Sequence, residues 1–187
     1  MLLTEKEARA ATDKMLSFVT AEDAVVSVAG EVYSHLRFAA NSFQTSGRRE
    51  NVTATVTVWK DAGAGAGAGR KRGSASANGV DEASLRKAVA EAERVASISP
   101  PDREYLPSLG PQTYRPTQGF AEATANISPA ERAKFIGDII SEAERAKVIA
   151  AGFHQARGSA GATATKNGNF AYERTSNVSL SMTSRTP

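Results

Sequence analysis

Two histidines, His35 and His154, are the first residues to test as metal ligands or general bases. Neither belongs to an HExxH or HExxxH arrangement, which would place two imidazoles on one face of a helix around a metal. Both fall in segments predicted as strands, where a lone histidine is more often a packed or surface side chain than a ligand. The chain has no cysteine, so thiolate chemistry and disulfides are excluded.

Other catalytic patterns are also missing from the sequence. No serine lies in a G-x-S-x-G context, which a nucleophile elbow requires. Glu91, Glu93, Glu142 and Glu144 alternate with cations, a pattern typical of a solvated, ion-paired helix face rather than a paired acid–base site. We therefore assign no catalytic, cofactor-binding or metal-ligating residue from the sequence.

The stretch KDAGAGAGAGRKRG, residues Lys60–Gly73, raises the possibility of a phosphate-binding loop. No glycine in it precedes a lysine, as a Walker loop requires, and the dinucleotide spacing of glycines fails at its sixth position. The stretch lies between two predicted strands, so we expect a flexible hairpin loop at 61–73. Arg70, Lys71 and Arg72 at its base are expected to be solvated charges, with contact to an anionic partner as the weaker alternative.

Composition narrows the classes of protein. The chain has 187 residues, 41% of them hydrophobic, and a net charge of +3 that is dispersed apart from the triplet Arg70–Arg72. This distribution disfavours nucleic acid as a partner, since a nucleic-acid interface carries a broader basic face. No apolar run is long enough to span a membrane, and the charged first turns do not form a signal peptide. We expect a cytoplasmic protein.

Periodicity in the first half predicts helices and strands in alternation. A helix over about 4–19 begins with a capping box formed by Thr4 and Glu7. Residues 23–44 are predicted as strand, turn and strand, with Gly30 breaking the run. A strand with one wetter face follows at 51–59, and a helix capped by Asp81 covers 80–98.

The second half repeats this order of helix and strands after a proline-rich connector at 100–127. Ser128, Pro129 and Glu131 form a helix start, and helical spacing continues to about residue 149. Asn167-Gly168 predicts a hairpin before a final alternating strand. The connector is expected to lie extended across a surface, given its apolar residues Tyr105, Leu106, Leu109 and Tyr114.

Together these patterns predict an α+β fold: an antiparallel β-sheet with helices packed on one face. A helix followed by strands occurs twice, which indicates a possible internal duplication; the repetitive nature of strand patterns is the alternative. The predicted division is a first helix/strand unit at 1–99, the connector at 100–127 and a second unit at 128–187. All three are expected to belong to one N-terminal domain of a longer parent protein.

Three segments in this order resemble one family: HLRFAANSFQTSGRRENVTATVTV, RGSASANGVDEASLRKAVAEAERVA and FAYERTSNVSLSMTSRT. They are similar to the N-terminal region of the TldD/PmbA family, also called modulators of DNA gyrase. The resemblance runs from about Leu2 to Thr186, and its specificity lies in the combined order of the segments. The glycine–alanine run departs from the family pattern, which has a short turn there.

The resemblance implies a zinc metallopeptidase, a hydrolase acting in proteolysis or peptide maturation on unfolded or extended peptides. It implies a homo- or heterodimer with a TldD/PmbA-type subunit. The family's zinc ligands, an HExxxH helix and a later cysteine, match no position here, so zinc is expected only outside this chain. The implied role is that of a scaffold or substrate-cavity domain, inactive alone. The alternative is a stand-alone, non-enzymatic interaction domain.

Overall fold

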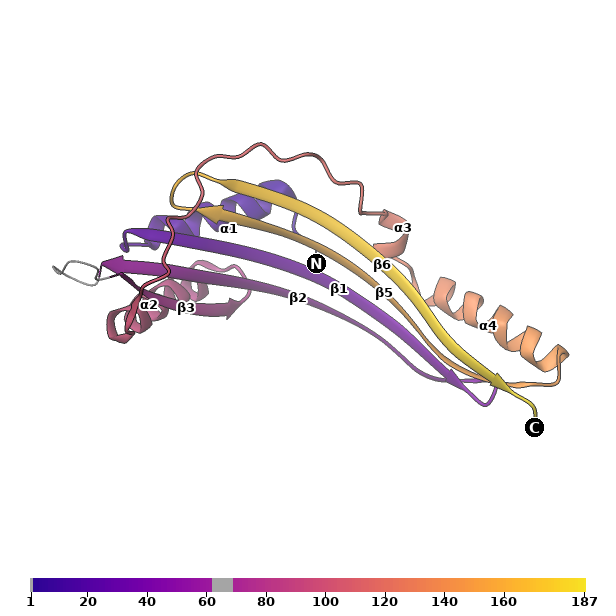
Figure 1. Ribbon diagram of the computed structural model, residues 1–187. Coiled ribbons are helices and arrows are strands. Elements are labelled where there is room, and N and C mark those ends of the chain that lie inside the picture. The colour runs from indigo at the N-terminus through magenta and orange to yellow at the C-terminus, as the bar shows by residue number, and fades with distance from the viewer. Residues whose placement is uncertain (1, 62–68) are drawn as a thin grey trace. The chain divides into compact units, whose positions relative to one another are not determined.

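A computed structural model describes residues 2–61 and 69–187 (Figure 1). It contains four helices and six strands within these ranges. In chain order they are α1 (Glu5–Phe18), β1 (Asp23–Ala39), β2 (Ser42–Asp61), β3 (Arg70–Asn78), α2 (Glu82–Ile98), β4 (Pro101–Asp102), α3 (Glu122–Ala125), α4 (Pro129–Arg145), β5 (Ile149–Thr165) and β6 (Phe170–Arg185).

The strands form one six-stranded sheet in the order β4-β3-β2-β1-β5-β6. β2 pairs antiparallel with β3, from Thr53 opposite Asn78 to Asp61 opposite Arg70. Neighbouring strands run in opposite directions throughout (Figure 1). The α+β class with an antiparallel sheet, predicted from the sequence, is confirmed. The order helix, strand, strand occurs twice, first as α1-β1-β2 and later as α4-β5-β6.

The chain forms two compact units, and four of the strands contribute residues to both. The first unit contains Met1–Gly30, Asn51–Pro116 and Ala160–Glu173; the second contains Glu31–Glu50, Thr117–Ser159 and Arg174–Pro187. The division at 1–99, 100–127 and 128–187 stays a prediction. Most of the glycine–alanine run expected as a flexible loop, residues 62–68, lies outside the described residues.

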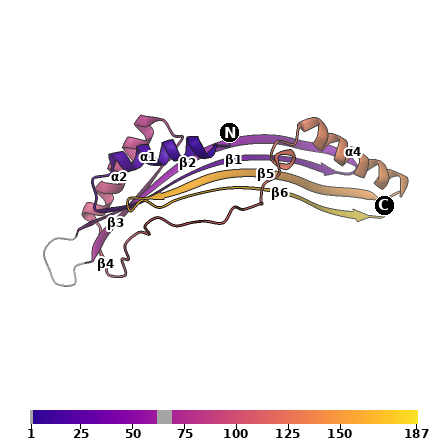
Figure 2. The same ribbon diagram turned by 90° about the horizontal axis from the view of Figure 1, so that it is seen from above.

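In the first unit, α1 and α2 lie on the same side of the strands (Figure 2). Both begin as the sequence predicted: Thr4 and Glu7 form the capping box of α1, and Asp81 caps α2. Apolar residues of the two helices pack on alternate residues of β1 and β2, which is the pattern expected for one buried sheet face. Its fully buried members include Met15, Val26, Val28, Val56, Val58, Leu85 and Val89.

In the second unit, α4 covers one face of the strands. Leu36 and Phe38 of β1 pack against Ile136 and Ile140 of the helix, together with Ala150 of β5. The capping box of Ser128 and Glu131 predicted for α4 is present. Because side chains alternate along a strand, residues next to these buried ones point to the opposite face.

The turn expected near Gly30 is wrong, because β1 continues unbroken from Asp23 to Ala39. Gly30 keeps the alternation of buried and half-buried residues, so nothing in its position requires a turn. The chain reverses instead at Ala40 and Asn41, whose φ angles are 50° and 54°. Asn41 anchors this turn, since its side chain donates to Val148 O at 2.8 Å and accepts from the Ala150 amide at 2.7 Å.

The helix predicted to reach about residue 149 ends at Arg145. Lys147 adopts a left-handed φ of 56° there. The amide of Lys147 donates to Glu144 O at 3.0 Å and that of Val148 to Ala143 O at 2.9 Å, which is the Schellman closure of a helix. The apolar residues that follow, assigned to the helix from their spacing, lead into β5.

Candidate functional site

The two histidines lie in different surroundings. His35 of β1 is on the face turned away from α4, since its neighbours Ser34 and Leu36 are buried. His154 of β5 is only 2% exposed, and its ring meets Phe135 of α4 edge-on at 5.7 Å. In residues 2–61 and 69–187, no three His, Cys, Asp or Glu side chains gather to hold a metal ion. The residues present do not fit a zinc site, and we assign them no metal chemistry.

Arg132 of α4 and His154 form a buried pair of basic groups. Arg132 is 1% exposed and donates from one guanidinium nitrogen to Ile127 O at 3.0 Å. Within the described residues, its Nε and the Nδ1 of His154 have no hydrogen-bond partner. Burial lowers the pKa of His154, and the charge of Arg132 lowers it further. Burial, with a smaller contribution from the charge of Arg48, also lowers the pKa of Arg132.

The opposite face of the second unit carries three aromatic rings in contact. The ring of His35 lies 5.8 Å from that of Tyr33 and stacks on that of Phe153 at 5.6 Å and 19°. Gly47 makes room for the imidazole, because a Cβ there would lie 2.7 Å from Cε1 of His35. Phe153 keeps 36% of its surface exposed. This face therefore presents aromatic surface on the side of the strands opposite α4.

Charged side chains border the aromatic rings and are paired with one another. Arg49 and Arg157 each lie over the ring of Tyr33, at 4.8 Å and 5.6 Å from its centre. Each also pairs with Glu31 at 3.3 Å. Gln155 accepts a hydrogen bond from the Tyr33 hydroxyl at 3.2 Å. These arginines thus have an anionic partner on the same face.

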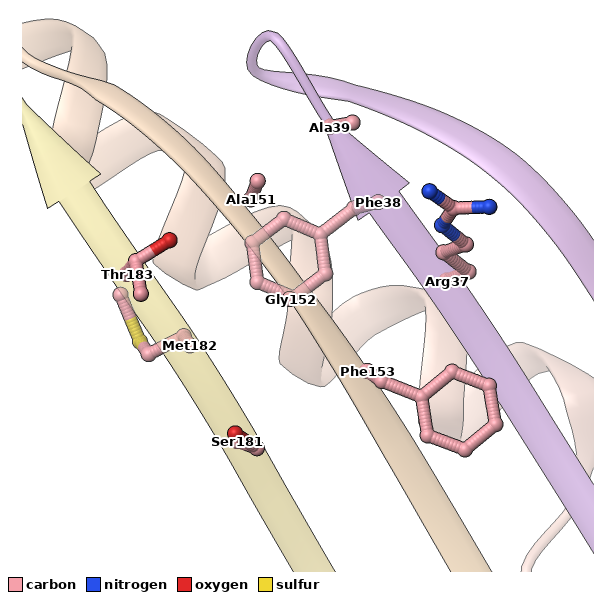
Figure 3. Close-up of a pocket in the computed structure, with 9 residues that line it drawn as sticks. All are labelled: Arg37, Phe38, Ala39, Ala151, Gly152, Phe153, Ser181, Met182 and Thr183. Carbon is pink, nitrogen blue, oxygen red and sulfur yellow. The ribbon is translucent and has the colours of Figure 1, made fainter.

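A shallow pocket of about 280 Å³ lies beside Phe153, across the ends of β1, β5 and β6 (Figure 3). Its residues form rows that cross the three strands. The middle row holds Phe38, which packs toward α4. Because side chains alternate along a strand, the rows on either side of it face away from the helix. The two rows are Arg37, Phe153 and Ser181, and Ala39, Ala151 and Thr183.

β6 is an edge strand of the sheet. Its outer edge is used at one point, where the Ser176 amide donates to Gly119 O at 2.8 Å. In an antiparallel strand, alternate residues direct their main-chain groups to the same neighbour. Val178, Leu180 and Met182 therefore direct theirs outward, and no segment of the described chain pairs with them. These three side chains are between 38% and 52% exposed.

In the first unit, Asp23 holds the proline-rich connector. It accepts hydrogen bonds from the Tyr105 hydroxyl at 2.7 Å, the Ser108 amide at 2.8 Å and the Ser108 hydroxyl at 2.5 Å. Burial raises the pKa of Asp23, but the bonds from Ser108, Tyr105 and Ala24 outweigh it and keep the pKa below its usual range. Burial and the bond to Asp23 raise the pKa of Tyr105 to about 12.

Of the four apolar residues expected to hold the connector against the surface, Tyr105 is half-buried with its ring 5.9 Å from that of Trp59, whereas the two leucines contribute little. Leu106 is 82% exposed and Leu109 is 62% exposed. Polar contacts hold the segment instead: the Thr165 hydroxyl donates to Leu109 O at 2.7 Å, and the Asn169 side chain donates to the Tyr114 hydroxyl at 2.8 Å.

The basic triplet lies at the start of β3. Arg70 pairs with Asp61 at 3.4 Å and lies over the ring of Tyr105, while Lys71 donates to Ser97 O at 3.3 Å. Two of the three cations thus contact the chain itself.

Solved structures share this arrangement of strands and helices. TldE from Thermococcus kodakarensis matches 96% of this chain and 43% of its own, with a TM-score of 0.77 and 12% identity. This chain is similar to TldE in fold. A putative modulator of DNA gyrase from Thermotoga maritima matches 96% of this chain and 44% of its own, with a TM-score of 0.72 and 14% identity. A putative modulator of DNA gyrase from Bacteroides thetaiotaomicron matches 97% of this chain and 41% of its own, with a TM-score of 0.75 and 12% identity.

The resemblance to TldD/PmbA-type proteins predicted from the sequence is therefore confirmed at the level of fold. The chain spans less than half the length of these solved structures. No protein-family model matches the sequence, and no curated protein matches it. None of the helices in the described ranges is long and apolar enough to cross a membrane.

Sequence reasoning did not single out Arg37 or Asp23. The alternation of Tyr33, His35 and Arg37 along one strand is a signal that could have placed these side chains on one face. The pairing of β1 with β5, far apart in the sequence, adds Phe153 to them. Asp23 carried no local signal, since its partners lie in the connector.

Proposed function

We propose that this chain is the N-terminal scaffold and substrate-cavity domain of a TldD/PmbA-type metallopeptidase subunit, acting in proteolysis or peptide maturation in the cytoplasm. Hydrolysis would depend on a zinc motif outside this chain. The fold shared with TldE and the gyrase modulators supports this assignment. We propose a dimer with a TldD/PmbA-type subunit as the working form, and an extended peptide as the substrate.

The observation that carries a peptide-binding role is the outer edge of β6. Its main-chain groups at Val178, Leu180 and Met182 point outward, and the Ser176 amide on the same edge donates to Gly119 O, which supports pairing with a second segment. An extended peptide adding a strand there would gain main-chain hydrogen bonds that do not depend on its sequence. That property suits an enzyme acting on unfolded substrates.

The side chains of β6 fit the same role. Val178, Leu180 and Met182 form an exposed apolar row, and Ser179, Ser181 and Thr183 form a polar row on the other face. Residues 175–184 contain no charge and no proline, the two devices that most often protect an edge strand from pairing. A bound strand would meet apolar side chains on one face and hydroxyls on the other.

Main-chain pairing is tested with labelled extended peptides methylated on alternate backbone nitrogens, in two complementary registers. Strand addition predicts that one register binds as the parent peptide does and the other binds much more weakly, measured by fluorescence anisotropy. On the protein side, Leu180→Pro removes an outward amide and should abolish binding. Leu180→Thr keeps the amide and should retain it, with circular dichroism checking the fold of both variants.

Equal binding of the two methylated peptides would contradict strand addition at β6. So would unchanged binding by a folded Leu180→Pro protein.

The alternative is a stand-alone interaction domain with no catalytic part. It is distinguished by the intact mass of the protein in its native cell, traced through the peptide FIGDIISEAER, residues 135–145. A mass more than double 19.6 kDa supports the metallopeptidase subunit, whose remaining part is then searched for HExxxH and a cysteine. A mass of 19.6 kDa favours the interaction domain.

A further inference from the structure

We propose that the pocket at the ends of β1, β5 and β6 binds the C-terminal carboxylate of a peptide, with Arg37 as the carboxylate-binding residue. Taking a peptide as the ligand rests on the proposed function, but the mode of binding does not depend on pairing at β6. The proposal stands on three properties of the pocket: one cation without a partner among the described residues, an apolar lining, and hydroxyl groups at its rim.

Arg37 differs from the other arginines on this face. Arg49 and Arg157 each pair with Glu31, whereas Arg37 has no ion pair or hydrogen bond with any described residue. Its side chain extends from β1 toward Ala39 at the edge of the pocket (Figure 3). A guanidinium offers paired N–H donors in a planar fork that matches the two oxygens of a carboxylate.

The remaining lining is suited to the residue that carries the carboxylate. Ala39 and Ala151 are small lining residues in the row nearer the end of β1, so the pocket is open beside the larger side chains of Arg37 and Phe153. The exposed ring of Phe153 supplies an apolar wall. A volume of about 280 Å³ is slightly below the range of drug-binding pockets, roughly 300–1,000 Å³, so it suits one terminal residue.

The hydroxyl-bearing residues favour a peptide terminus over an isolated anion. Ser181 and Thr183 of β6 line the pocket on the side away from Arg37. The last amide of a peptide has one donor and one acceptor, and hydroxyl groups can satisfy both.

A polyanion such as nucleic acid fits less well. The pocket contains a single cation, and the two other arginines of this face, Arg49 and Arg157, are already paired with Glu31. An acidic side chain inside a peptide also fits less well, because methylene groups separate its carboxylate from the backbone, whereas a C-terminal carboxylate and the last apolar side chain are bonded to the same Cα.

The test compares three fluorescein-labelled extended peptides: one ending in leucine with a free carboxylate, the same peptide as its C-terminal amide, and that amide with one internal residue replaced by glutamate. A charge-assisted pair with Arg37 predicts that the free carboxylate binds roughly 10-fold or more tightly than either amide. Arg37→Gln should remove this preference while the amide binds as before. Ala151→Leu, which fills the pocket, should also remove it.

Arg157→Gln is the matched control, since it removes the same charge from the same face outside the pocket. Loss of the preference in Arg157→Gln as strongly as in Arg37→Gln would overturn the proposal, because general electrostatics would then explain it. Equal affinity for acid and amide would overturn it too, as would equally tight, Arg37-dependent binding of the glutamate peptide or of single-stranded DNA.

The two proposals fail separately. If the protein discriminates between carboxylate and amide but backbone methylation has no effect, the result supports the pocket and contradicts strand addition at β6. Sensitivity to methylation without discrimination between carboxylate and amide removes the pocket and leaves strand addition.

Discussion

Gly73 of β3 lies so close to α2 that an added Cβ would be 2.0 Å from the carbonyl oxygen of Ala92 and 2.4 Å from the amide nitrogen of Ala96. Both atoms belong to helix backbone, which cannot move aside as a side chain can. Gly73, the last residue of the stretch Arg70–Gly73, thus allows β3 and α2 to pack closely together. Its role is structural.

Gly73→Ala is expected to destabilise the protein by about 1–3 kcal/mol or more, because β3 and α2 must separate. Urea unfolding followed by circular dichroism measures this as a lower midpoint. Gly110→Ala is the matched control, since the nearest atom to its Cβ would be 3.8 Å away. Equal midpoints for the two variants would contradict the close contact.

Asp23 is expected to make stability depend on acid pH. Its pKa is held below the usual value in the folded protein, so its contribution is present above the unfolded pKa of 3.8 and is lost as pH falls below it. Asp23→Asn should lower the urea midpoint at pH 7 and narrow the difference between pH 7 and pH 3. Asp138→Asn, the same change on the exposed surface of α4, is the control at pH 7 and should lower the midpoint less.

His154 is expected to lower the stability of the folded protein as the pH falls below 6.5, a higher pH range than that of Asp23. Its folded pKa lies below the usual 6.5, so the neutral form is favoured in the folded protein. Stability is therefore full above pH 6.5 and falls as the pH drops toward the folded pKa. NMR titration should show the imidazole of His154 titrating below that of an unfolded chain. His154→Gln should flatten the pH dependence between pH 7 and pH 5.

Arg132→Met is expected to keep or raise the urea midpoint. It replaces a buried cation that has one hydrogen bond and no carboxylate partner in the described chain with an apolar side chain of similar length. The same change should raise the pKa of His154, since the charge of Arg132 lowers it. Arg132→Ala, which leaves a cavity, should lower the midpoint. A strong loss of stability in Arg132→Met would reveal a partner that stabilises the charge.

The sequence by itself determined where the three long helices begin. The cap residues Thr4, Asp81 and Ser128 are where their patterns predicted, because capping depends on residues a few positions apart. The alternation along the strands predicted the antiparallel α+β class. Excluding phosphate loops and nucleophile elbows also needed only local spacing.

Tertiary structure decided everything that joins distant segments. The chain turns at Asn41 rather than at Gly30, because Asn41 forms hydrogen bonds with Val148 and Ala150, more than 100 positions away in the sequence. The connector is held by Asp23 rather than by its exposed leucines. Arg37 and Phe153 line one pocket because β1 and β5 are neighbours in the sheet. Strand pairing fixes which residues meet, and a sequence pattern fixes only the face on which each one lies.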